Sequence, residues 1–189
     1  MFKAFFKTCF RLAGWKIKGG IPPEVKKCVL VAAPHTSNWD FIWGMGGLAE
    51  FNYDVKYLAK KELFRFPIKG MLLKLGGMPV DRSKHNRLTD AIVDLFNQHK
   101  KLIVLFPPEG TRSAVKKWKT GFYHVAVQAN IPIILGYLDY QHKIAGIESI
   151  IYPTGDIKAD FQKISNFYKN AHPKIPANFL LPDIEAIVK

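Results

Sequence analysis

The chain has 189 residues, a length typical of one domain and sufficient to bury a hydrophobic core without disulfide or metal staples. Hydrophobic residues make up 48% and charged residues 23%, which excludes a disordered or collagen-like chain. Lysines and arginines number 28 against 15 aspartates and glutamates, giving a net charge of +13. So basic a chain favours polyanionic partners such as nucleic acid, an anionic membrane, or phosphorylated and acidic substrates.

Cys9 and Cys28 are the only cysteines, and their spacing fits neither a zinc site nor a disulfide framework, which favours a reducing cytosolic compartment. The sequence has no run of 18 or more apolar residues, so we expect no membrane-spanning helix. Lys3, Lys7 and Arg11 interrupt the apolar residues too often for the core of a signal peptide, and we expect no export signal.

The first predicted element is an amphipathic helix over residues 2–13. Its apolar side chains recur at i, i+3, i+4, i+7, i+8 and i+11, and three basic residues lie along one flank at i, i+4 and i+8. The helix could dock on the core of the domain. It could equally lie in a membrane interface, with aromatic rings in the acyl boundary and basic side chains on anionic headgroups.

The remaining chain alternates short apolar runs with amphipathic segments. Strands are expected over 28–33, 55–59, 77–80, 101–106 and 131–138, and as a later pair over 142–147 and 148–152. Helices are expected over 39–51, 68–75, 85–99, 121–130 and 156–170. This alternation predicts an α/β single-domain layered fold with a largely parallel central sheet flanked by helices.

Two nucleotide-binding patterns and one hydrolase pattern are weak or missing. Gly44–Ala49 matches G-x-G-x-x-A but lies inside a predicted helix, about ten residues beyond the end of a strand, where close helix packing explains it better. The chain contains neither a G-x-x-x-x-G-K-[ST] loop nor a G-x-S-x-G elbow, which argues against a P-loop enzyme and a serine hydrolase.

A polar cluster, Pro34–Asp40, follows the predicted strand that ends at Ala33. Asn38 is placed to cap the next helix, and Asp40 lies in its first turn, where the helix dipole favours a carboxylate. From there Asp40 can accept a hydrogen bond from one imidazole nitrogen of His35 and leave the other free to take a proton. The two side chains could also simply cap the helix, and spacing alone leaves both interpretations open.

Two more polar loops follow predicted strands, at Pro107–Ser113 and at Val80–Ser83. In the first of these, Gly110 permits close backbone approach, Thr111 offers a hydroxyl, and Arg112 offers a planar fork suited to phosphate. The carboxyl ends of parallel strands meet at one edge of a sheet, so the three loops are expected to form one site with a base and phosphate anchors.

These residues resemble the motifs of the glycerolipid acyltransferases, the 1-acyl-sn-glycerol-3-phosphate acyltransferase-like family. The four ordered blocks are His35-x-x-x-x-Asp40, Gly76–Arg82, Pro108–Ser113 and Ile131–Ile133. The linking segments Ala59–Leu63 and Trp118–Phe122 are also similar, so the resemblance covers about residues 29–140.

The resemblance implies a glycerol-phosphate acyltransferase-like fold and transfer of a fatty acyl group from acyl-CoA or acyl carrier protein to a lysophospholipid hydroxyl. The default acceptor is 1-acyl-glycerol 3-phosphate, giving phosphatidate at the cytoplasmic face of the membrane. Residues 1–20 would be a membrane-interfacial helix and residues 21–189 the acyltransferase domain. The family's pattern makes His35 the general base and Asp40 its orienter, assigns Pro132 to a wall near the acyl path, and assigns acceptor binding to Lys60, Arg82, Glu109, Gly110, Thr111 and Arg112.

The chemistry agrees with this resemblance, because attack of an alcohol on a thioester needs a base and a polarised carbonyl but no covalent serine or cysteine. Beyond the acyl donor, no cofactor, metal or nucleic acid is implied. Pro79 and Pro107 depart from the aromatic residues usual in the family, which leaves glycerol 3-phosphate, another lysophospholipid or a lyso-aminolipid open as acceptors. The alternative function is a non-catalytic basic binder of anionic lipid or nucleic acid, which has no need of a base and its orienter.

The other histidines have no patterned partner and are expected to be structural or surface residues. The spacings of histidine, aspartate and glutamate predict no metal-ligand set. These histidines are His85, His99, His124, His142 and His172.

Overall fold

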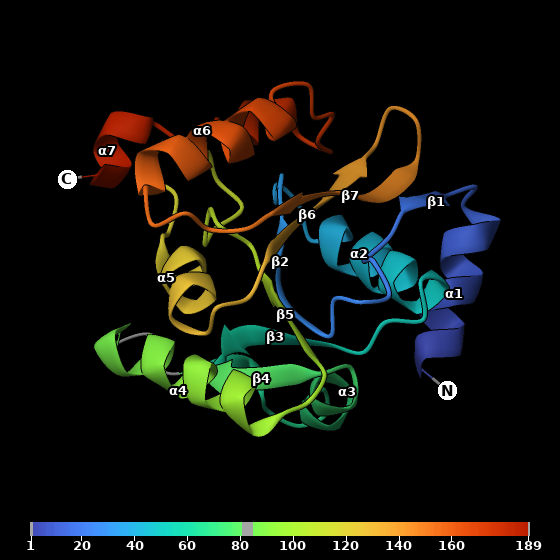
Figure 1. Cartoon of the computed structure of the whole chain (residues 1–189). Coiled ribbons are helices and arrows are strands. Elements are labelled where there is room, and N and C mark those ends of the chain that lie inside the picture. The colour runs from blue at the N-terminus through green and yellow to red at the C-terminus, as the bar shows by residue number, and fades with distance from the viewer. Residues whose placement is uncertain (1, 81–84, 189) are drawn as a thin grey trace.

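The computed structural model of the protein describes residues 2–80 and 85–188 (Figure 1). Its strands are β1 (Lys16–Gly19), β2 (Lys27–Ala32), β3 (Val55–Lys60), β4 (Gly77–Val80), β5 (Leu102–Phe106), β6 (Ile133–Asp139) and β7 (Ile144–Ile151). Its α-helices are α1 (Phe2–Leu12), α2 (Trp39–Glu50), α3 (Lys69–Lys74), α4 (His85–Gln98), α5 (Gly121–Gln128), α6 (Ile157–Tyr168) and α7 (Ile184–Val188). Two short 3₁₀ turns are η1 (Lys61–Leu63) and η2 (Pro176–Asn178).

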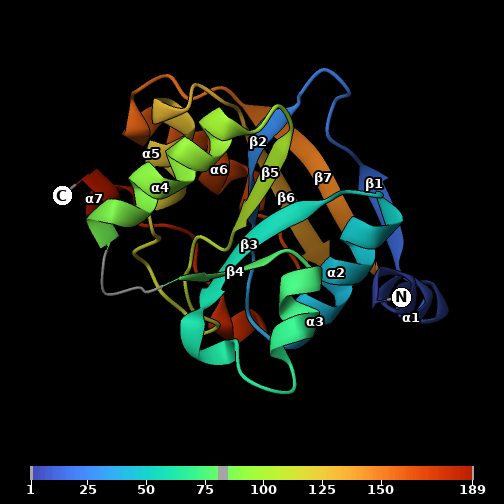
Figure 2. The same cartoon turned by 90° about the horizontal axis from the view of Figure 1, so that it is seen from below.

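The strands form one seven-stranded sheet in the order β1-β7-β6-β2-β5-β3-β4. Every neighbouring pair is parallel except β6 and β7, which are antiparallel. Helices α4, α5 and α6 cover one face of the sheet, and α1, α2 and α3 cover the other (Figures 1 and 2). The predicted α/β fold with a largely parallel sheet is therefore confirmed.

The central strand β2 shows why its sequence is apolar without interruption. Val29 and Val31 pack into the core under α4, α5 and α6, whereas Cys28 and Leu30 pack into a second cluster on the opposite face. Because successive side chains of a strand point to opposite faces, a strand covered on both sides must be apolar at every position.

One prediction of secondary structure was wrong, and one strand was missed. The expected pair of strands over 142–147 and 148–152 is the single strand β7, whose polar Glu148 and Ser149 lie at its less buried positions rather than in a turn. The four exposed residues of β1 show no apolar alternation, yet they pair in parallel with β7 from Lys16 opposite Ile144 onward.

Two of the three glycines of α2 allow close packing, which is the role that the sequence predicted for Gly44–Ala49. A Cβ on Gly46 would lie 2.7 Å from Cβ of Phe10 in α1, and one on Gly47 would lie 2.8 Å from Cβ of Ala145 in β7. Close packing thus accounts for Gly46 and Gly47, whereas a Cβ on Gly44 would meet nothing within 4 Å.

Helix α1 docks on the domain through its buried Phe6 and Phe10. Its basic residues pair with acidic ones of the same chain: Arg11 lies 2.6 Å and Lys7 3.9 Å from Glu50, and Lys3 pairs with Asp54. The helix nevertheless leaves Phe5 61% and Leu12 84% exposed. Within the described ranges, no helix is both long and apolar enough to cross a bilayer.

Candidate active site

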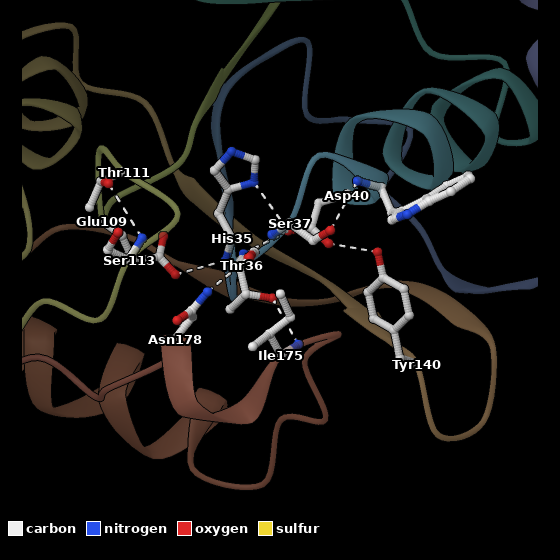
Figure 3. Close-up of polar contacts among 11 residues, drawn as sticks. His35, Thr36, Ser37, Asp40, Glu109, Thr111, Ser113, Tyr140, Ile175 and Asn178 are labelled. Atoms are coloured by element: carbon white, nitrogen blue, oxygen red, sulfur yellow. Dashed lines mark hydrogen bonds and ion pairs between the residues drawn. The ribbon is translucent and has the colours of Figure 1, made fainter.

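The loop between β2 and α2 brings His35 and Asp40 together (Figure 3). Nδ1 of His35 lies 3.4 Å from Oδ2 of Asp40. The same oxygen accepts hydrogen bonds from the backbone N–H of Thr36 at 2.7 Å and of Ser37 at 2.8 Å. Asn38 occupies the N-cap position of α2, as predicted, but its side chain makes no capping hydrogen bond.

Tyr140, from the turn between β6 and β7, donates a 2.6 Å hydrogen bond to Oδ1 of Asp40 (Figure 3). Burial by itself would raise the pKa of Asp40, but hydrogen bonds from His35, Tyr140 and the two backbone donors lower it below its ordinary value. An ionised Asp40 accepts a hydrogen bond from the Nδ1–H of His35. The other ring nitrogen, Nε2, then carries the lone pair. Sequence analysis missed Tyr140, because nothing in the local sequence marks a contact so distant along the chain.

Glu109 contacts the backbone of His35. Its side chain is buried, with Oε1 accepting a 2.9 Å hydrogen bond from the backbone N–H of His35. Oε2 is buried without a hydrogen-bond partner among the described residues. Burial raises the pKa of Glu109 to about 7. The predicted acceptor ligand is thus placed to hold the backbone of the proposed base.

A cavity of about 800 Å³ opens beside the His35–Asp40 pair. Four of the six predicted acceptor ligands line it together with that pair: Lys60, Gly110, Thr111 and Arg112. The fifth, Glu109, lies behind it, and the sixth, Arg82, lies outside the described residues together with Asp81 and Ser83 of the third predicted loop. The loops after β2 and β5 therefore meet at one site, as the sequence predicted.

The far wall of the cavity is apolar and crosses the sheet. Leu30 of β2, Leu105 of β5 and Gly136 of β6 form part of it, and Gly44 of α2 lines one side. Such a wall suits an alkyl chain. Pro132, expected near the acyl path, precedes β6 at the opposite end of the strand, where its carbonyl accepts a hydrogen bond from Val29.

The C-terminal part of the chain contacts the loop that carries His35. The backbone N–H of Ile175 donates to Oγ1 of Thr36 at 3.3 Å, and Nδ2 of Asn178 donates to the Thr36 carbonyl at 3.4 Å (Figure 3). The buried hydroxyl of Tyr168 lies 3.1 Å from the carbonyl of Val31 and 3.0 Å from that of Gly136. Because these contacts join distant segments, sequence reasoning missed them as well.

Comparison with known proteins agrees with the resemblance seen in the sequence. A solved structure, the 1-acyl-sn-glycerophosphate (LPA) acyltransferase PlsC from Thermotoga maritima, shares the fold with a TM-score of 0.60 at 19% identity, covering 86% of this chain and 72% of that one. The chain is 29% identical over 131 residues to the 1-acyl-sn-glycerol-3-phosphate acyltransferase of Escherichia coli (strain K12), covering 65% of this chain and 52% of that protein. It is 31% identical over 118 residues to the human 1-acyl-sn-glycerol-3-phosphate acyltransferase beta, covering 59% and 41% of the two chains.

The chain thus spans about half the length of the E. coli relative. A family model described as Acyltransferase matches residues 17–135, which is more than half of the chain. The chain belongs to the acyltransferase family.

Proposed function

We propose that the protein is an O-acyltransferase that moves a fatty acyl group from a thioester to a hydroxyl of a lysophospholipid. The observation that carries this proposal is the His35–Asp40 pair at the edge of a cavity with a cationic rim and an apolar wall. A purely binding protein has no use for an imidazole held by an ionised carboxylate.

In the proposed reaction, Nε2 of His35 accepts the proton of the acceptor hydroxyl while that oxygen attacks the thioester carbonyl. The carbon–sulfur bond then breaks, and the proton passes from His35 to the departing thiolate. Asp40 holds the tautomer and stabilises the imidazolium, as the carboxylate of a catalytic triad does. Tyr140 positions Asp40 through its 2.6 Å hydrogen bond.

The rim of the cavity supports a phosphorylated acceptor. Lys60 and Arg112 are both exposed cations that line the cavity, and Thr111 adds a hydroxyl. A guanidinium binds phosphate through two parallel hydrogen bonds, and an ammonium adds a point charge. We therefore propose 1-acyl-glycerol 3-phosphate as the acceptor, with phosphatidate as the product and Arg82 as a further phosphate ligand.

The surface around the cavity supports a membrane substrate. Leu63 and Ile68 line the cavity and are 50% and 44% exposed, and Phe66 between them is 96% exposed. Exposed apolar side chains gathered near the mouth of a cavity are typical of an interaction site. We propose that this segment, together with the exposed side of α1 that carries Phe5, rests on the cytoplasmic face of the bilayer, so that the lipid enters without crossing water.

The net charge of +13 suits the phosphates of acyl-CoA, an acidic acyl carrier protein and anionic lipid. The deciding experiment measures thiol release from acyl-CoA by the full chain, with and without lysophosphatidate. Release that depends on the acceptor and falls about 10²–10⁴-fold in a folded His35→Ala variant is expected. His99→Ala is the matched control, since His99 is an exposed residue directly after α4 and its Nδ1 contacts the carbonyl of Leu95.

Full turnover by folded His35→Ala would remove His35 from the mechanism. If no thiol is released from acyl-CoA or acyl carrier protein with any glycerol-type or lyso-aminolipid acceptor, while anionic vesicles still bind, the protein is a non-catalytic lipid binder.

A further inference from the structure

We propose that Asp139, His142 and His172 form a zinc-binding site on the surface of the domain. Asp139 is the last residue of β6, His142 lies in the turn to β7, and His172 lies in the loop that follows α6. Figure 1 shows this loop running beside the β6–β7 turn. The spacing of the histidines in sequence gave no sign of the site, because only the fold joins the two segments.

The ligand atoms already converge. Nδ1 of His142 lies 2.7 Å and Nδ1 of His172 lies 3.2 Å from Oδ2 of Asp139, and all three ligand atoms lie within 4.8 Å of one another. Ligands of a tetrahedral zinc ion with bonds of about 2.0–2.1 Å lie about 3.3 Å apart. To admit the ion, the contact of His142 with Oδ2 of Asp139 must open by about 0.6 Å, and ligand atoms up to 4.8 Å apart must close by up to about 1.5 Å. Rotation of the two exposed imidazoles is sufficient for this.

The backbone holds the two segments together independently of any ion. The N–H of Tyr140 donates a 2.9 Å hydrogen bond to the carbonyl of His172. The N–H of His142 donates a 2.9 Å hydrogen bond to Oδ1 of Asp139, which leaves Oδ2 as the oxygen that faces both imidazoles. A site assembled before the metal arrives costs little ordering entropy on binding.

The donor set selects the kind of metal. Two imidazoles and one carboxylate suit zinc and other first-row transition metals, whereas Mg²⁺ and Ca²⁺ require oxygen ligands. The side chains of His142 and His172 are 53% and 41% exposed, so water can complete the coordination. The nearby cation of Lys143 is engaged by the carbonyl of Ala13, 3.0 Å away.

Oδ2 of Asp139 faces both imidazoles. In the absence of metal, the same geometry is satisfied by two Nδ1–H groups that donate to one carboxylate oxygen. Zinc would replace those two protons, so metal binding should release protons or shift the imidazole tautomers to Nε2–H.

The experiment uses the full chain, stripped with a chelator and then titrated with Zn²⁺ by calorimetry and with Co²⁺ by visible absorption. We expect one ion per chain, the d–d bands of Co²⁺ bound to nitrogen and oxygen ligands, and a rise in Tm on addition of Zn²⁺. His142→Ala and His172→Ala should each weaken binding at least about tenfold. Both are exposed side chains, and the Tm of each stripped variant establishes that it folds.

His124→Ala is the matched control, because His124 is an exposed histidine on α5 outside the cluster, and His35→Ala tests whether the ion sits at the active site instead. Neither should change the affinity for Zn²⁺. Equal affinity in the His142→Ala and His172→Ala variants, or no binding at millimolar Zn²⁺, would overturn the proposal and leave the cluster a hydrogen-bonded clasp between two loops.

Discussion

Oη of Tyr140 lies 2.6 Å from Oδ1 of Asp40, although the two residues are 100 positions apart in the chain. The ring of Tyr140 meets that of Trp15 edge-on at 5.1 Å, and Trp15 stacks on Trp43 at 5.6 Å. The carboxylate that orients His35 is therefore itself positioned by a tyrosine wedged against the aromatic residues that join α2 to the segment after α1.

Tyr140→Phe should lower kcat about tenfold and leave both KM values nearly unchanged. The variant removes one hydrogen bond to a charged group, an interaction of roughly 1.5–3 kcal/mol, while the backbone donors of Thr36 and Ser37 still hold the other oxygen of Asp40. Steady-state kinetics across pH measure the effect, because a less stabilised carboxylate also shifts the acid limb of the profile. Tyr152→Phe, on a 65% exposed tyrosine, is the control and should behave as wild type. Unchanged kcat in folded Tyr140→Phe would show that Asp40 needs no such support.

Arg112→Lys should raise the KM for lysophosphatidate about ten- to a hundredfold and leave that for acyl-CoA nearly unchanged. An ammonium cannot reproduce the two parallel hydrogen bonds of a guanidinium to phosphate. Lys60 and Arg82 are proposed to bind the same phosphate. The Arg82/Arg112 double variant should therefore show a larger rise in the KM for lysophosphatidate than Arg112→Lys alone. A rise confined to the KM for the acyl donor would instead assign Arg112 to the phosphates of coenzyme A.

Glu109→Gln should flatten the dependence of stability on pH. Folding raises the pKa of Glu109 from 4.5 to about 7, so the folded state binds the proton more tightly and wild type loses free energy of unfolding as pH rises through that interval. The loss is on the order of 2–3 kcal/mol between pH 5 and pH 8. Urea denaturation of both proteins at the two pH values measures it, with the exposed Glu24→Gln as control. Parallel wild-type and Glu109→Gln profiles would mean that the buried carboxyl stays ionised throughout.

Phe66→Ser should weaken sedimentation of the protein with vesicles that contain anionic lipid. Phe66 is 96% exposed, so its loss removes apolar contact with the bilayer without opening a hole in the core. Phe5→Ser tests α1 in the same way. Salt should weaken the binding of wild type and of each variant to these vesicles, because exposed charges are screened beyond about 8–10 Å. Tyr152→Ser is the control, because Tyr152 is an aromatic residue outside the proposed surface and its 65% exposure is close to the 61% of Phe5. If neither Phe66→Ser nor Phe5→Ser binds less than that control, the membrane contact lies elsewhere.

Gly44→Leu and Gly46→Leu provide a matched pair on one helix. A Cβ on Gly44 would meet nothing within 4 Å, and Gly44 lines the cavity, so leucine there should fill space that the acyl chain needs. Turnover of long-chain acyl-CoA should fall at least about tenfold relative to short-chain acyl-CoA, with the Tm maintained. Gly46→Leu should instead lower the Tm, because its side chain would overlap Phe10. Equal loss for long and short chains in the Gly44 variant would place the acyl group outside this cavity.

The sequence predicted those parts of the fold and site that are encoded locally. The continuous apolar runs of β2, β5 and β6 predicted buried strands. The spacing of His35 and Asp40 allowed their contact but did not decide between it and simple capping of the helix. The sequence of β1 shows no apolar alternation, and the strand is held in the sheet by its pairing with β7. The supporting hydroxyl of Tyr140 and the pairing of Lys3, Lys7 and Arg11 with Glu50 and Asp54 depend on how distant segments meet, which no local pattern records.

The pairing of β1 with β7 also imposes an order on folding during synthesis. Lys16 leaves the ribosome early, but its partner Ile144 is synthesised more than a hundred residues later. At roughly 5–20 residues per second, β1 waits on the order of 6–25 seconds for the strand it joins. Tyr140 belongs to the same late segment, so His35 and Asp40 are synthesised long before the residue that donates a hydrogen bond to Asp40. Premature termination before this point releases a chain that lacks both the strand partner of β1 and the hydroxyl that holds Asp40.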